Sequence, residues 1–231
     1  MLGSTEGWSA DFQTGLNAYK IGNYATALRE FRPLGEQGDA FSQFNLGVMY
    51  DNGLGVTENN EEAVKWYKLS AEQGNARAQN NLGVMYDHGE GVPEDDREAV
   101  KWHTLAAKQG IARAQFNLAV MYDNGWGVPK DDKKAVKWYK LAAEQGNAPA
   151  QFNLGVMYDK GEGLPEDDQE AVNWYRRAAE QGLVDAQLNL GLMYDNGLGV
   201  AENDKKAVKW YLLAAKQGDA DAQYNLGVMY D

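Results

Sequence analysis

The side chains that most often carry catalysis are few and scattered in this sequence. It has two histidines, His88 and His103, and no cysteine, which excludes disulfides, thiolate metal sites and a cysteine nucleophile. No nucleophile motif, phosphate loop or metal-binding histidine spacing is present. The acid pairs Asp95–Asp96 and Asp167–Asp168 stand before apolar helical patterns, where carboxylates serve as helix N-caps. We therefore expect no enzymatic activity, no cofactor and no metal.

One polar side chain recurs at a fixed interval and offers binding chemistry. The phrase Asn-Leu-Gly-Val-Met-Tyr-Asp begins at Asn45 and returns every 36 residues, with Ala119 in place of glycine and Leu192 in place of valine. An amide is both donor and acceptor, so each copy can pair with the backbone of a ligand. The alternative is that each asparagine bonds a neighbouring helix or loop, and the sequence leaves both interpretations open. This asparagine row comprises Asn45, Asn81, Asn117, Asn153, Asn189 and Asn225.

Two rows of side chains flank the asparagines at the same interval. The aromatic row comprises Phe44, Asn80, Phe116, Phe152, Leu188 and Tyr224. Exposed aromatic residues would anchor a ligand, but aromatic residues at helical spacing more often form core. The variable row comprises Phe41, Arg77, Arg113, Pro149, Asp185 and Asp221. Because it changes from repeat to repeat on a common frame, the variable row is where specificity for a partner would lie.

An acidic row also follows the interval. It comprises Asp51, Asp87, Asp123, Asp159, Asp195 and Asp231. Carboxylates at the C-terminal end of a helix interact unfavourably with its dipole, so their recurrence there requires an explanation. We interpret them as turns onto the following loop amides, with an acidic rail for lysine or arginine as the alternative.

The fixed interval predicts an all-α solenoid of 36-residue helix-turn-helix repeats. In the segment 75–110, apolar residues recur at three- and four-residue steps over Asn75 to His88 and again after Asp95, which predicts two helices. Gly83 lies inside the first of them, where glycine costs about 1 kcal/mol relative to alanine. Its recurrence in other copies predicts the close approach of a neighbouring helix.

The predicted organisation has a cap, five repeats and a final half-repeat. Residues 1–38 form an N-terminal leader, loose over 1–8, and a tetratricopeptide-like capping pair of helices. Residues 219–231 form the first helix of an incomplete sixth repeat, whose uncovered apolar face is a candidate for end-to-end self-association. The five repeats are 39–74, 75–110, 111–146, 147–182 and 183–218.

Composition narrows the range of partners. The net charge of −12 makes nucleic acid and anionic membrane surfaces unfavourable partners. The mean hydropathy is −0.61. No stretch approaches the roughly 20 apolar residues of a membrane helix, so we expect a soluble protein without membrane insertion.

The unit Ala-x-Ala-Gln-x-Asn-Leu-Gly-x-Met-Tyr-Asp-x-Gly-x-Gly-Val, followed by Ala-Val-x-Trp-Tyr-x-x-Ala-Ala-x-Gln-Gly, resembles the Sel1-like repeat family, a relative of the tetratricopeptide repeats. The resemblance covers residues 39–231. It implies a right-handed α/α superhelix used as an adaptor in protein complexes. Many bacterial members are exported or periplasmic, which favours a bacterial protein in that location over a cytoplasmic one.

Together these patterns predict a non-enzymatic scaffold or adaptor that binds a peptide or protein segment in the concave groove lined by the first helices. The expected binding residues are the asparagine row together with Phe44, Phe116, Phe152, Arg77 and Arg113. Two alternatives are a structural module that associates through its ends and a cell-wall-associated enzyme.

Overall fold

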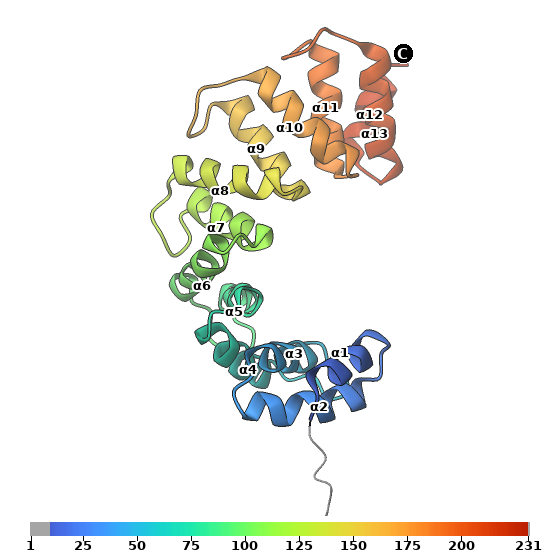
Figure 1. Cartoon of the computed structure of the whole chain (residues 1–231). Helices are drawn as coiled ribbons and strands as arrows, with labels where there is room; N and C mark the ends of the chain where they lie inside the picture. The colour runs from blue at the N-terminus through green and yellow to red at the C-terminus, as the bar shows by residue number, and fades with distance from the viewer. Residues whose placement is uncertain (1–9, 231) are drawn as a thin grey trace, which may run out of the picture. The chain divides into compact units, whose positions relative to one another are not determined.

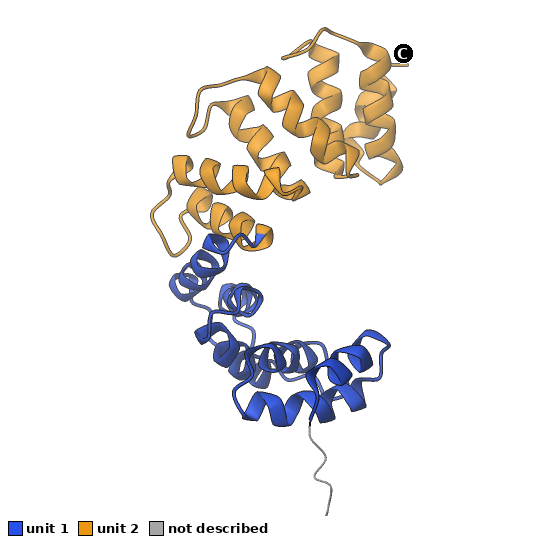
Figure 2. Cartoon of the chain, viewed as in Figure 1, with its two compact units in different colours: residues 1–111 blue, residues 112–231 orange. Residues whose placement is uncertain are grey.

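The computed structural model describes residues 10–230, so the predicted leader at residues 1–8 and Asp231 of the acidic row lie outside the described residues. The described residues form helices and no strands. The chain divides into two compact units, residues 1–111 and residues 112–231 (Figure 2). Between residues 10 and 230, no helix combines the length and the apolar composition required to cross a membrane.

The helices of both units are labelled in Figure 1. Those of unit 1 are α1 (Phe12–Lys20), α2 (Tyr24–Glu36), α3 (Ala40–Asp51), α4 (Asn60–Glu72), α5 (Ala76–His88) and α6 (Asp96–Lys108). Those of unit 2 are α7 (Ala112–Asn124), α8 (Asp132–Glu144), α9 (Ala148–Lys160), α10 (Asp168–Glu180), α11 (Val184–Asn196), α12 (Asp204–Lys216) and α13 (Ala220–Val228). Within each unit, every helix packs against the helices before and after it in the chain. The fold is the predicted all-α solenoid of helix-turn-helix repeats.

Polar N-caps begin most of the described helices, as the sequence predicts, although α11 begins after Leu183 without a side-chain cap. The carboxylate of Asp95 accepts hydrogen bonds from the backbone N–H groups of Arg97 and Glu98 at the start of α6. Asp167 accepts from the N–H of Glu170 at the start of α10 in the same way. A side-chain acceptor at this position satisfies a backbone donor that has no partner inside the helix. The acid pairs are therefore cap residues.

The two helices of a repeat approach each other at a glycine, which confirms the predicted reason for its recurrence. A Cβ atom on Gly155 of α9 would lie 2.7 Å from Cδ1 of Tyr175 on α10. Gly47 and Gly191 face tyrosine rings equally closely. In repeat 111–146 the position is Ala119, which is fully buried in the cluster that contains Tyr139. The tyrosine ring thus fills the space left by a missing side chain.

Buried glutamines join consecutive repeats. In unit 2, Gln151 Nε2 donates to the carbonyl of Ala143 at 3.0 Å, and Gln181 Nε2 donates to Gln151 Oε1 at 2.8 Å. The same pair of bonds recurs at Gln187 and Gln217. Gln151 and Gln187 each add a side-chain hydrogen bond to a carbonyl in the last turn of the preceding helix, which also accepts a backbone N–H from Gly146 or Gly182. The junctions between repeats are therefore polar as well as apolar.

The predicted cap pair, α1 and α2, has its own apolar cluster around Phe31, with Leu46 and Met49 of α3. The two helices are connected by the short turn at Ile21, Gly22 and Asn23. Helix α2 carries a buried carboxylate, Glu30, which is 2% exposed. Its Oε2 accepts the backbone N–H of Asp11 at 3.0 Å.

Candidate peptide-binding face

The asparagine row lies midway along the first helix of each repeat. In unit 1 it occupies α3 and α5, and in unit 2 it occupies α7, α9, α11 and α13. All six side chains are half-buried. The amides are thus neither free surface groups nor core residues.

A tyrosine of the second helix connects the acidic row to the asparagine row. Tyr175 Oη donates to Asp159 Oδ2 at 3.1 Å and also hydrogen-bonds the side chain of Asn189 in the following repeat. Burial, and then the charge of Asp159, raises the pKa of Tyr175 above its ordinary value, so the hydroxyl stays protonated and can donate. We call this arrangement the Asp–Tyr–Asn relay. It recurs as Asp51, Tyr67 and Asn81, and as Asp123, Tyr139 and Asn153.

The relay changes the interpretation of the acidic row. Asp51, Asp123, Asp159 and Asp195 accept tyrosine hydroxyls from the second helix of their own repeats, at 3.0 to 3.2 Å. This contact, and not the predicted turn onto loop amides, is the bond that the structure shows for the carboxylate at the end of α3, α7, α9 and α11.

The bonding role of these tyrosines was not predicted from the sequence. The signal was present in the spacing, because aspartate and tyrosine are 16 residues apart, and tyrosine and the next asparagine are 14 residues apart.

Part of the asparagine row makes hydrogen bonds within the protein. Asn153 Nδ2 donates to Tyr139 Oη at 3.0 Å, and Asn45 Nδ2 donates to the carbonyl of Phe41 at 2.7 Å. Each of these amides retains a second N–H and a carbonyl oxygen. An internal bond fixes the orientation of the amide, so the remaining polar atoms of Asn45 and Asn153 also have fixed directions.

The aromatic row packs against the same tyrosines. Phe44, Phe116 and Phe152 are half-buried, with ring centroids 6.1, 6.0 and 5.7 Å from those of Tyr67, Tyr139 and Tyr175. Such tilted ring pairs stabilise the helix pair, and each of the three phenylalanines remains partly exposed. The row therefore belongs to the packing within each repeat and also borders the asparagines.

Repeat 75–110 departs from this pattern at two positions together. Asn80 replaces the phenylalanine and is 4% exposed, so this position of the aromatic row is not accessible from the surface in this repeat. Its Nδ2 donates to Asn81 Oδ1 at 3.3 Å. His103 replaces the tyrosine and is fully buried, so the Asp–Tyr–Asn relay is absent from this repeat. Burial raises the pKa of Asp87, the carboxyl that the tyrosine would have contacted.

The variable row is the most accessible part of the first helices. All six of its residues are exposed, and Phe41 is 64% exposed. It stands four residues before the asparagine row, and residues at this separation share one face of a helix. Arg77 and Arg113 thus lie on the same helix face as Asn81 and Asn117.

The candidate catalytic side chains do not come together. The side chain of His88 is 59% exposed at the end of α5, with Nδ1 4.0 Å from Asp87 Oδ2. Among residues 10–230, no group of three or more histidine, cysteine, aspartate or glutamate side chains could hold a metal ion.

Comparison with known families and structures follows the repeat pattern. The Sel1 repeat model matches residues 40–75, 76–111, 112–147, 148–183, 184–219 and 220–231. A comparison with curated proteins finds no match.

Two solved structures are similar over almost the whole chain. A protective antigen of uropathogenic Escherichia coli, described as displaying an SLR fold, is 39% identical with a TM-score of 0.90, and the match covers 94% of this chain and 48% of the antigen. A Sel1 repeat protein from Oxalobacter formigenes is 37% identical with a TM-score of 0.86, covering 95% of this chain and 87% of that one. The chain thus spans about half the length of the E. coli antigen.

Proposed function

The chain belongs to the Sel1 repeat family, whose members are generally protein-interaction scaffolds, and from this premise we propose that it is a non-enzymatic scaffold that binds a peptide or protein segment along its first helices. The observation that carries the proposal is the combination of a constant frame and a variable exposed row. The frame is the asparagine row, in which Asn45 and Asn153 are held by hydrogen bonds to neighbouring groups. The variable row lies on the same helix faces and differs in charge and size at each repeat.

In unit 2 the proposed face combines groups for the backbone of a ligand with groups for its side chains. The amides of Asn117, Asn153 and Asn189 pair with the backbone of an extended segment, and the partly exposed rings of Phe116 and Phe152 contact its side chains. With one asparagine per repeat, neighbouring asparagines are about 10 Å apart, which corresponds to about three residues of an extended ligand chain. The contacts to the backbone supply affinity without strong sequence preference.

Charge on the variable row sets the direction and sequence of the ligand. Arg113 is exposed on α7 and Asp185 is exposed on α11, with the uncharged Pro149 between them on α9. A ligand therefore places an acidic residue near Arg113 and a basic residue near Asp185, about six residues further along at three residues per repeat. Like charges in these places are repelled, which gives specificity more than affinity.

A peptide-display selection on the full chain tests the proposal. Peptides selected on the wild type are then measured against the double variant Arg113→Glu/Asp185→Arg, which reverses the two charges and leaves the net charge unchanged. We expect convergent peptides with opposite charges about six residues apart, and at least tenfold weaker binding to the variant. A peptide with its two charges exchanged should recover binding to the variant.

The matched control is Lys140→Glu/Glu180→Lys, which makes the same exchange at exposed positions of the second helices α8 and α10. This control should bind the selected peptides as the wild type does. Equal losses in both variants, or a selection that yields no convergent peptide, would refute binding along the first helices.

A further inference from the structure

Two cations of unit 2 converge on one tyrosine side chain near the C-terminal end of α11. Arg176 Nη2 of α10 donates to Tyr194 Oη at 3.0 Å, and Lys206 Nζ of α12 lies 4.8 Å from the centroid of the Tyr194 ring. Tyr194 is 6% exposed, Arg176 is half-buried and Lys206 is exposed. We call these three residues, which come from three consecutive helices, the Arg–Tyr–Lys cluster.

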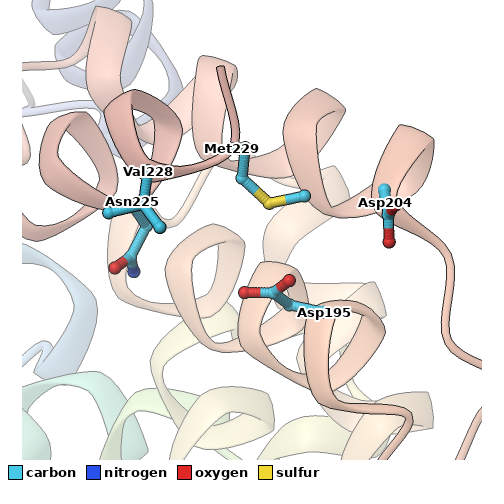
Figure 3. Close-up of a pocket in the computed structure, with 5 residues that line it drawn as sticks. All are labelled: Asp195, Asp204, Asn225, Val228 and Met229. Carbon is cyan, nitrogen blue, oxygen red and sulfur yellow. The ribbon is translucent and has the colours of Figure 1, made fainter. Parts of the chain in front are cut away.

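No carboxylate neutralises the cluster. Between residues 10 and 230, neither Arg176 nor Lys206 forms an ion pair with an acidic side chain. The acids close to the cluster in sequence, Asp195 and Asp204, line a different, open pocket (Figure 3). Residues one or two positions apart on a helix do not face each other, which explains this separation. The two positive charges therefore have no internal counter-ion.

An arginine–tyrosine bond of the same kind occurs in unit 1 without the lysine. Arg32 Nη2 donates to Tyr50 Oη at 2.7 Å. Glu62 stands at the position equivalent to Lys206, and it forms an ion pair with Lys65. The second cation is thus replaced by an acid, so that this position in unit 1 has no excess of positive charge.

A lysine over the equivalent tyrosine ring also occurs in repeat 111–146, where it has a partner. Lys134 Nζ lies 5.0 Å from the centroid of the Tyr122 ring and 3.1 Å from Asp131 Oδ2. Asp131 is the N-cap of α8, and the N-cap of α12 at the equivalent position is Asn203. The amide caps the helix as the carboxylate does, but it carries no charge. The replacement therefore removes the carboxylate that would pair with Lys206.

The excess of positive charge acts on the hydroxyl of Tyr194. Burial acts to raise the pKa of Tyr194, but the hydrogen bond and charge of Arg176 and the charge of Lys206 outweigh burial and lower this pKa from its ordinary value. A phenol oxygen that accepts from a cation still has a proton to donate. The cluster therefore combines guanidinium, ammonium and hydroxyl donors with two uncompensated positive charges.

These donors match a phosphate group better than a carboxylate. A phosphate monoester carries about −1.5 to −2 charges at pH 7 and three strong acceptor oxygens, whereas a carboxylate has one charge and two oxygens. The planar fork of an arginine pairs with two phosphate oxygens at once, and a lysine adds a point charge. We propose that Arg176, Tyr194 and Lys206 form a binding site for a phosphate group, as the free ion or as a monoester.

The site is independent of the proposed peptide-binding face. Tyr194 lies nine residues after Asp185 of the variable row, which corresponds to about two and a half helical turns. The two side chains therefore lie on opposite sides of α11, and a phosphate on the cluster does not compete with a peptide along the first helices.

Isothermal titration calorimetry of the full chain with inorganic phosphate and with phenyl phosphate, at pH 7.5 and constant ionic strength, tests the proposal. We expect saturable binding of one phosphate per chain at millimolar concentrations or below. The double variant Arg176→Gln/Lys206→Gln should bind both probes at least tenfold more weakly. The matched control is Arg177→Gln/Lys205→Gln, which removes the same charges from the neighbouring residues and should bind as the wild type does.

A second variant, Asn203→Asp, supplies the carboxylate that Asp131 provides in repeat 111–146 and keeps the helix cap. It should bind phosphate at least tenfold more weakly, with an unchanged melting temperature in phosphate-free buffer. Tighter binding of phenyl phosphate than of inorganic phosphate would identify the ligand as a phosphate ester, and the reverse order would identify it as the free ion. The proposal is overturned if neither probe binds saturably, if acetate binds as tightly, or if the control variant loses as much affinity as the cluster variant.

Discussion

The substitution Tyr67→Phe removes one hydroxyl from the Asp–Tyr–Asn relay and keeps the ring that covers Gly47. The hydroxyl donates to Asp51 Oδ2 at 3.0 Å and hydrogen-bonds the side chain of Asn81. A hydrogen bond to a charged group contributes about 1.5–3 kcal/mol and a neutral one about 0.5–1.5 kcal/mol. Because phenylalanine is less costly to bury than tyrosine, part of this sum is offset. We expect a net loss of about 2 kcal/mol in the free energy of unfolding at pH 7.

The loss should depend on pH through Asp51. Burial raises the pKa of Asp51 above its ordinary value, and the hydrogen bond from Tyr67 lowers it, so the variant raises this pKa further. A carboxyl with a raised folded-state pKa binds its proton more tightly in the folded protein than in the unfolded chain. The stability gained in this way is present below the unfolded pKa and is lost as the pH rises through the folded pKa. The difference between wild type and variant should therefore shrink as the pH falls from 7 through the raised pKa.

Urea denaturation followed by circular dichroism at pH 7 and pH 4 measures this difference. The matched control is Tyr50→Phe in the same repeat, whose hydroxyl accepts only an exposed bond from Arg32 Nη2 at 2.7 Å. We expect the control to cost about 0.5 kcal/mol at both pH values. The reasoning is refuted if Tyr67→Phe costs no more than Tyr50→Phe at pH 7, or if its cost is the same at pH 4.

Three further substitutions test the packing within and between repeats. Leucine at Gly155 overlaps the Tyr175 ring and should lower the free energy of unfolding by about 1–3 kcal/mol. Leucine at Gly227, which has no atom within 4 Å of its Cβ position, should raise it by about 0.5–1 kcal/mol through helix propensity. Thermal denaturation of both variants measures the difference, and equal effects would contradict the close approach of Tyr175 to Gly155. Gln151→Leu removes the donor at 3.0 Å from the carbonyl of Ala143 and should cost about 1–3 kcal/mol in urea denaturation. A loss below 0.5 kcal/mol would show that the glutamines do not hold the repeats together.

The periodic features of the fold were predictable because they arise from contacts near in sequence. Helix caps such as Asp95 depend on residues three positions away, and the apolar stripes follow the turn of the helix. The recurrence of a costly glycine at Gly155 predicted a close neighbour. The sequence did not identify that neighbour, because Tyr175 is reached only after an intervening loop.

The candidate site was less predictable, because its geometry depends on contacts with other helices. Whether an amide such as Asn153 points to a ligand or to a neighbour depends on a hydroxyl 14 residues away. Packing decides whether an aromatic position is accessible, and it leaves Phe152 half-buried while it buries Asn80. These outcomes depend on which side of the first helix the second helix covers. Periodicity gives only the residues that share a face.

The junction contacts also bear on how the array changes over generations. Gln187 makes with Ala179 and Gln217 the bonds that Gln151 makes with Ala143 and Gln181, so the two junctions are chemically the same. A recombination event that duplicates or deletes 36 residues in register therefore joins surfaces that already match. The number of repeats can change in one genetic step without a new core, and the exposed row of the inserted copy is then free to diverge.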